Sequence, residues 1–327
     1  MSRLDVGPSV SNRRYGRARD GRALHRRHLR RRSTMKSSCG GEKDFDAGVS
    51  IASLPWGDAK TTTIETMVQR DENGKRKAFV ARPANRELAR GIVLVLHTAI
   101  GPWETFATSC CEALASTGYD VVAPDLYGLG ECVFDKETQR RIRGGFSQND
   151  FQFDVNENLL LENRAAFGAR GALEALREYR ASAVGGVPER YAAVGFCLGG
   201  QVALDLARGL APFDGGIGEI AGVASFHGVL DAPDLGGEAA RACEVEIYHG
   251  DADPFTTSDA VDECLRDLEG RGIVGNTKVL RFKGVKHAFT RPEKVKASDH
   301  EAGFGYDEKA AMESWKSCEA MLQRLFP

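Results

Sequence analysis

The sequence has no long hydrophobic run and no clustered cysteines. Its longest uninterrupted apolar stretch, Ile92–Leu96, has the length of a strand and falls far short of the roughly 18 residues that a membrane helix needs. The eight cysteines are scattered along 327 residues, with no CxxC pair and no Cys/His cluster of metal-ligand spacing. A disulfide framework is typical of shorter secreted chains. We therefore expect reduced thiols in an intracellular compartment, no membrane association and no bound metal.

Lysine and acidic residues are nearly missing from the N-terminus. Residues 1–34 hold eleven arginines, two acids and no lysine, whereas residues 35–327 carry 33 basic and 44 acidic residues. The acidic body argues against a nucleic-acid-binding surface. Repelling arginines and sparse apolar side chains predict that residues 1–50 are a disordered extension.

Three interpretations of this arginine-rich extension remain open. It fits a transit peptide for the mitochondrion or plastid, because such peptides are rich in arginine and poor in acids. It also fits an upstream extension with the working start at Met35, in which case we expect a cytoplasmic protein. The third interpretation is an RNA-binding arm.

Strand and helix patterns alternate from about residue 60, which predicts a single domain over residues 60–327. The predicted strands are Lys77–Ala81, Gly91–His97, Asp120–Pro124, Tyr191–Val194, Gly222–Phe226, Val245–Tyr248 and Thr277–Phe282. The predicted helices are Thr105–Thr117, Asn156–Ala181, Leu198–Arg208, Ser258–Gly270 and Asp307–Leu325. This alternation predicts an α/β fold with a mostly parallel central sheet and helices on both faces. The stretch Gly128–Asp154 fits no element and is either a functional lid or a solvated surface excursion.

The strongest functional signal is the segment YAAVGFCLGG, Tyr191–Gly200. An apolar strand ends at Gly195 and a helix begins after Cys197, in the G-x-S-x-G pattern of a nucleophile elbow with Cys in place of Ser. Gly195 and Gly199 leave room for the backbone to cross at a sharp strand-to-helix turn. The helix N-terminus favours a thiolate and offers the amide of Leu198 to an oxyanion. The pattern therefore predicts that Cys197 is a nucleophile.

An acid and a histidine should follow such a nucleophile in that order. The segment HGDADPF holds two candidate acids, and we prefer Asp253 because Asp251 suits a turn or cap. His287, in GVKHAF, follows a predicted strand and should lie at the carboxyl edge of the sheet, where open α/β sheets bind ligands. We expect His287 to act as the base and Asp253 to orient its ring. The loop Thr98–Gly101 should supply the second oxyanion-hole amide, that of Ala99.

Together these motifs resemble the dienelactone hydrolase family. The segments YAAVGFCLGG, HGDADPF, GVKHAF and VAPDLYG carry the resemblance, which runs from about Arg90 to the C-terminus. It implies an α/β-hydrolase fold and a Cys197–His287–Asp253 triad that cleaves an ester, lactone or thioester. It also implies a small-molecule substrate, with no cofactor and no metal.

The resemblance further implies arginines that bind a substrate carboxylate, since the planar guanidinium can hold a carboxylate through two hydrogen bonds. Family members that act on dienelactone have one such arginine shortly after the catalytic histidine, where this chain has Arg291. A second arginine comes from the lid region. The remaining predicted substrate contacts are Arg140, Arg141 or Arg143 in that region, together with Thr98 and Phe196.

One position departs from those family members. They have a glutamate just after the first buried strand, which takes part in activating the cysteine, and this chain has Thr98 there. Glu104 lies nearby, but we expect it to begin the next helix, where an acid suits the helix dipole. A broader esterase or thioesterase activity is therefore favoured over dienelactone hydrolysis. The alternatives are a catalytically weak member that binds a small molecule or responds to oxidation of the same thiol, and an RNA-associated protein that acts through the arginine-rich arm.

Overall fold

A computed structural model of the chain describes residues 54–56, 64–84, 89–132, 168–182, 189–209, 219–231, 239–240, 242–273 and 275–327. Residues 1–50 lie outside these ranges, and so does most of the predicted lid, with Arg140, Arg141 and Arg143. The described segment 54–56 precedes the predicted start of the domain, yet Leu54 is buried in the core.

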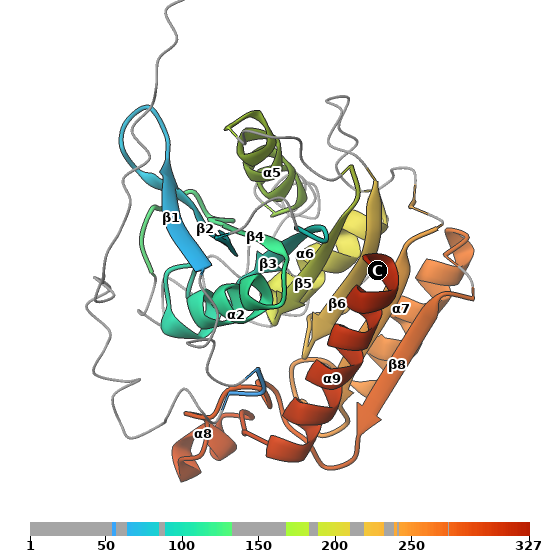
Figure 1. Cartoon of the computed structure of the whole chain (residues 1–327). Coiled ribbons are helices and arrows are strands. Elements are labelled where there is room, and N and C mark those ends of the chain that lie inside the picture. The colour runs from blue at the N-terminus through green and yellow to red at the C-terminus, as the bar shows by residue number, and fades with distance from the viewer. Residues whose placement is uncertain are drawn as a thin grey trace, which may run out of the picture.

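An eight-stranded sheet forms the centre of the molecule (Figure 1). Its strands are β1 (Ile64–Arg70), β2 (Arg76–Pro83), β3 (Ile92–Leu96), β4 (Asp120–Pro124), β5 (Tyr191–Phe196), β6 (Ile220–Phe226), β7 (Glu244–Gly250) and β8 (Thr277–Phe282). They lie in the order β1-β2-β4-β3-β5-β6-β7-β8. β1 and β2 pair antiparallel with their neighbours, and all pairs from β4 to β8 are parallel. The predicted mostly parallel sheet is confirmed.

Helices cover both faces of the sheet. They are α2 (Thr105–Ser116), α5 (Arg170–Ser182), α6 (Leu198–Ala207), α7 (Ser258–Gly270), α8 (Ala297–Glu301) and α9 (Glu308–Leu325). The core on one face combines α5, α6 and α7, and the core on the other combines α2 and α9. Alternate residues of β3 divide between the two: Ile92 and Leu94 pack into the first core, and Val93 and Val95 into the second. This burial on both faces explains why the sequence of β3 is a continuous apolar run.

Two elements were not predicted from the sequence, and both lack a strong hydrophobic pattern. β1 is an edge strand whose residues are only half-buried, so it shows no apolar run. α8 has five residues and none of them is buried. Of the predicted long helix Asn156–Ala181, the structure describes residues 168–169 and α5, and residues 156–167 lie outside the described ranges.

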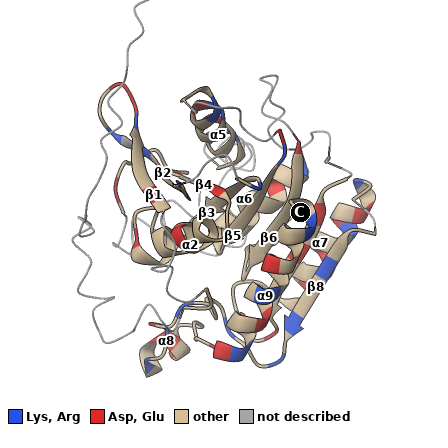
Figure 2. Cartoon of the chain, viewed as in Figure 1, with Lys and Arg blue, Asp and Glu red and all other residues tan. Residues whose placement is uncertain are grey.

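Charged residues lie mainly on the outer helices and the edge strands, while the central strands carry few (Figure 2). Among the residues that the structure describes, no helix is both long enough and apolar enough to cross a membrane. The parallel strands end together at one edge of the sheet, and the loops that follow β3, β5, β6, β7 and β8 therefore meet there.

Candidate active site

Cys197 occupies a sharp turn between β5 and α6. Its backbone has φ 55° and ψ −116°, a conformation that L-residues with a side chain rarely adopt. A Cβ added at Gly195 would lie 2.0 Å from the Gly199 carbonyl oxygen, and one added at Gly199 would lie 2.0 Å from the Leu96 oxygen. The two glycines are therefore required for β3, β5 and α6 to approach each other. The turn that the sequence motif predicts is present, with the strain typical of functional sites.

Asp253 and His287 come together beside this turn. Asp253 lies after β7, and its Oδ1 accepts hydrogen bonds from the amides of Phe255 at 2.8 Å and Thr256 at 3.2 Å. Its Oδ2 lies 2.6 Å from His287 Nδ1. The other candidate acid, Asp251, is exposed and accepts a hydrogen bond from the Gly284 amide instead. The structure thus places Asp253, and not Asp251, against the histidine.

His287 is almost completely buried, with 2% of its surface exposed. Nδ1 of His287 faces Asp253, so the hydrogen bond between the ring and Cys197 must involve the other nitrogen, Nε2. Burial alone would lower the pKa of His287, but the charges of Asp253 and Cys197 and the hydrogen bonds to both raise it to about 10. The ring therefore favours its charged form between a carboxylate and a sulfur.

Cys197 differs from most other cysteines of the described chain in its exposure. It is partly exposed, as is Cys132, whereas five others are buried. Burial is the main cause that raises the pKa of each of these five thiols: Cys110, Cys111, Cys243, Cys264 and Cys318. A thiol with a raised pKa is a poor nucleophile at neutral pH. These five are core residues.

Aromatic rings surround His287. The ring of Phe255 lies 5.1 Å from it between centroids, Phe304 lies at 5.7 Å and His227 at 5.0 Å. His227 Nε2 is 2.9 Å from Thr290 Oγ1, and burial lowers the pKa of His227, so its ring is neutral at pH 7. These rings keep water from most of His287 and hold its plane. No sequence motif marked Phe255, Phe304 or Thr290 for this role.

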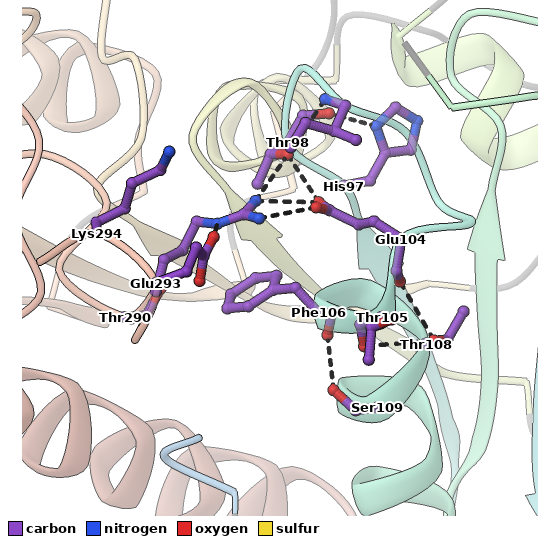
Figure 3. A network of polar contacts seen from close by, with 12 residues as sticks. His97, Thr98, Glu104, Thr105, Phe106, Thr108, Ser109, Thr290, Glu293 and Lys294 are labelled. Carbon is purple, nitrogen blue, oxygen red and sulfur yellow. Dashed lines mark hydrogen bonds and ion pairs between the residues drawn. The ribbon is translucent and has the colours of Figure 1, made fainter. Parts of the chain in front are cut away.

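A second polar group of the site is a buried ion-pair cluster that includes Glu104 and Glu293 (Figure 3). Arg291 Nη2 lies 2.9 Å from Glu104 Oε2, and Nη1 lies 3.2 Å from Glu104 Oε1. Arg291 Nε donates to Glu293, and the guanidinium stacks on the ring of Phe106 at 4.8 Å from the centroid. Both Arg291 and Glu104 are about 95% buried, with 5% and 4% of their surfaces exposed. The donors of Arg291 are engaged by protein carboxylates, which does not fit the prediction that it is available to a substrate carboxylate.

Glu104 begins α2, as predicted, but its carboxylate does not cap that helix. As N-cap residue it makes no side-chain capping hydrogen bond. The carboxylate instead accepts a hydrogen bond from Thr98 Oγ1 at 2.9 Å as well as those from Arg291. The sequence placed Thr98 where related enzymes have a glutamate. In the structure, a carboxylate from six residues further along binds the hydroxyl at that position.

Phe196 does not occupy the substrate-contacting position predicted for it. Its side chain is fully buried in the core between α2 and α9. Its ring lies 5.0 Å from that of Phe106, 4.9 Å from Phe226 and 5.9 Å from Trp56. Side chains alternate across a strand, and at position 196 this alternation points into the core.

The open surface hollow that Pro55 and Trp56 form with α9 shares no residue with the group around His287.

His97 supports the same edge of the sheet in a structural role. Its Nε2 accepts a hydrogen bond from the Leu126 amide at 3.0 Å, so its Nδ1 donates to the Thr98 carbonyl at 2.6 Å. Burial lowers the pKa of His97 to about 4, against a smaller effect of the Thr98 hydrogen bond. Within the described ranges, no group of three or more His, Cys, Asp or Glu side chains has the arrangement of a metal site.

Comparison with known proteins places the chain in a family. The model of the dienelactone hydrolase family matches residues 77–326. An uncharacterised protein of Caenorhabditis elegans is 32% identical over 161 residues, which cover 48% of this chain and 96% of that protein.

Two solved structures show the same fold. A dienelactone hydrolase-like promiscuous phosphotriesterase from metagenomic libraries and a protein named m3DLH are each 24% identical to this chain. Each superposes with a TM-score of 0.61, covering 81% of this chain and 99% of its own. The family match shows that the chain is a hydrolase, its sheet and these two structures show the α/β-hydrolase fold, and the chain belongs to the dienelactone hydrolase family.

Proposed function

We propose that this hydrolase cleaves a carboxylic ester, lactone or thioester of a small molecule through an acyl-cysteine intermediate on Cys197. The observation that carries the proposal is the chain of contacts from Cys197 through His287 to Asp253, at a strained turn that opens a helix. A nucleophile, a base and a group that orients the base are the parts that covalent hydrolysis needs.

In the first step, the sulfur of Cys197 attacks the carbonyl carbon and the carbonyl oxygen becomes an oxyanion. The amide of Leu198, at the N-terminus of α6, and that of Ala99 are the proposed donors to this oxyanion. Within the described residues, the Ala99 amide has no hydrogen-bond partner, as a donor reserved for substrate requires. His287 gives its proton to the departing alcohol or thiol, and the acyl group stays on the sulfur.

In the second step, His287 takes a proton from water, which attacks the acyl-cysteine. The carboxylic acid is released, the sulfur of Cys197 leaves as a thiolate, and His287 is again protonated, as at the start. Asp253 keeps Nδ1 of His287 occupied throughout, so Nε2 is the nitrogen that exchanges protons with the substrate. No step calls for a metal or cofactor.

A direct test compares the wild type with Cys197→Ala and Cys197→Ser on p-nitrophenyl acetate. We expect Cys197→Ala to lose at least about a thousandfold in kcat/KM, because the covalent route is gone and only binding and the oxyanion donors remain. Cys197→Ser tests whether a hydroxyl can replace the thiol in the same turn. Wild-type turnover in Cys197→Ala would disprove the proposal. No turnover by any form, with circular dichroism of a folded protein, would favour a role in small-molecule binding or thiol oxidation.

A further inference from the structure

We infer that Thr98, Glu104 and Arg291 form a clamp that positions the oxyanion loop, Thr98–Gly101, and that none of the three contacts the substrate. The inference rests on the proposed function, since it assigns the Ala99 amide to the oxyanion. It gives Arg291 a positioning role in place of the carboxylate binding that the family resemblance implied, and it gives Glu104 a positioning role beyond the helix start expected from the sequence.

The hydroxyl of Thr98 is the centre of the clamp. It donates to Glu104 Oε1 at 2.9 Å and accepts from the Ile100 amide at 3.2 Å and from Arg291 Nη1 at 3.4 Å. The bond to Ile100 closes a tight turn around the residue between them, which is Ala99. Turns of this kind, made by a Ser or Thr side chain to an amide two residues on, fix the local backbone.

The backbone of the loop is held on both sides of Ala99. The Thr98 carbonyl lies 2.6 Å from His97 Nδ1 and 3.5 Å from the Tyr127 hydroxyl. Gly101 has φ 121°, which favours glycine strongly. Because the carbonyl and the hydroxyl of Thr98 are both hydrogen-bonded, the peptide between Thr98 and Ala99 is held in one orientation. The Ala99 amide has no hydrogen-bond partner among the described residues.

Arg291 connects this loop to the segment that carries the base. It is four residues after His287 in sequence and reaches Thr98, which is 193 residues away. Its guanidinium is fixed by Glu104 on one edge, Glu293 on another and the ring of Phe106 on its face. The clamp thereby sets the distance between the oxyanion loop and the loop of His287. An oxyanion donor is effective only within a few tenths of an ångström of its place, so such a connection bears on the rate.

The geometry also separates the clamp from two other roles, which are the binding of a substrate carboxylate and the activation of the thiol. A substrate carboxylate would have to displace a protein carboxylate from a guanidinium that is 5% exposed. The Glu104 carboxylate is bound by Thr98 and Arg291, whereas Cys197 and Asp253 raise the pKa of His287 through their charges and hydrogen bonds. Thiol activation therefore falls to His287.

Two reactions of Cys197 distinguish positioning from activation. Acylation by p-nitrophenyl acetate passes through an oxyanion and needs the loop. Alkylation by iodoacetamide does not: the sulfur attacks the methylene carbon, iodide leaves, and no carbonyl oxygen gains charge. Both rates should be measured on the full chain, for the wild type, Thr98→Val, Thr98→Ser and Glu104→Gln, with Cys197→Ala as the background.

The clamp predicts that Thr98→Val, which keeps the shape and removes the hydroxyl, slows acylation at least about tenfold and changes alkylation by less than about twofold. Thr98→Ser retains the hydroxyl and should restore acylation to within about threefold of wild type. Glu104→Gln should behave like Thr98→Val, and it carries the test if the valine variant fails to fold. The loss should appear in kcat with little change in KM, because substrate binding is not involved.

Three results would overturn the inference. Unchanged acylation in both Thr98→Val and Glu104→Gln would show that the loop needs no clamp. Equal losses of acylation and alkylation would show that the cluster acts on the thiol. A wild type that is alkylated at Cys197 but never acylated would disprove the proposed function itself, and the clamp with it.

Discussion

The two sides of the candidate site differ in how they are built. On the nucleophile side, Cys197, Asp253 and His287 each follow a strand and are positioned by short local turns. On the oxyanion side, Thr98 is fixed by Glu104 and by Arg291, which lies in a distant part of the chain. The nucleophile side follows the family pattern, and the oxyanion side departs from it at position 98. The proposed chemistry thus rests on a local motif, and the proposed placing of the oxyanion loop on a long-range polar cluster.

The largest expected effect tests the assignment of the acid on the nucleophile side. Asp253→Asn keeps the shape but cannot hold the same tautomer of His287, so we expect kcat to fall by about a hundredfold to ten-thousandfold. Asp251→Asn is the matched control, because Asp251 contacts the Gly284 amide and not the histidine. Its kcat should stay within about threefold of wild type. Equal losses in the two variants, measured with p-nitrophenyl acetate, would mean that the acid has been misassigned.

The next effect concerns stability at the strained turn. Gly199→Ala would place a methyl group 2.0 Å from the Leu96 oxygen, so we expect a loss of about 3 kcal/mol in the free energy of unfolding, or failure to fold. Gly171→Ala in α5 is the control, since nothing lies within 4 Å of its added Cβ. It should stabilise the protein by about 0.5–1 kcal/mol through helix propensity. Urea unfolding measures both, and a tolerated Gly199→Ala would contradict the close approach of β3 and α6.

A smaller effect tests the charge of the oxyanion side. Arg291 with Glu104 and Glu293 makes a buried group with one excess negative charge. A substrate carboxylate about 8 Å away would be disfavoured by about 2 kcal/mol at an effective dielectric constant of about 20. We therefore expect kcat/KM for p-nitrophenyl butyrate to exceed that for mono-p-nitrophenyl succinate by about tenfold or more. Preference for the succinate would instead support the predicted carboxylate-binding arginines of the lid, Arg140 and Arg143, which lie outside the described residues.

The smallest effect is a shift in pH dependence. The pKa of His287, raised to about 10, means that its charged ring stands beside Cys197 at neutral pH and supports a thiolate. Alkylation of Cys197 by iodoacetamide should therefore have its inflection below the value of about 8.5 that is typical of a free thiol. The stabilisation that the charged ring gives the fold is complete below pH 6.5, the unperturbed pKa, and is lost as the pH rises through about 10. Asp253→Asn should move the inflection upward, and an inflection near 8.5 in the wild type would contradict the pairing.

The difference between the two sides also explains what could be predicted from the sequence. The turn at Cys197 could be predicted because it needs glycines at fixed positions nearby, so the local sequence carries the constraint. The pairing of Glu104 with Arg291 joins residues 187 positions apart, and no local pattern marks it. Phe196 was misplaced because a residue beside the nucleophile can face either side of the sheet, and only the packing against Phe106 and Phe226 decides which.

The central claim, an acyl group carried on Cys197, is tested most directly by mass spectrometry of the enzyme during turnover. The full chain is mixed with p-nitrophenyl acetate, quenched in acid within the first turnovers, and digested to locate the modification. The account predicts one acetyl group on the peptide that contains Cys197, which appears before the steady state and disappears once the ester is consumed. Steady hydrolysis with no acetylated Cys197, or with acetyl groups only on other residues, would contradict it.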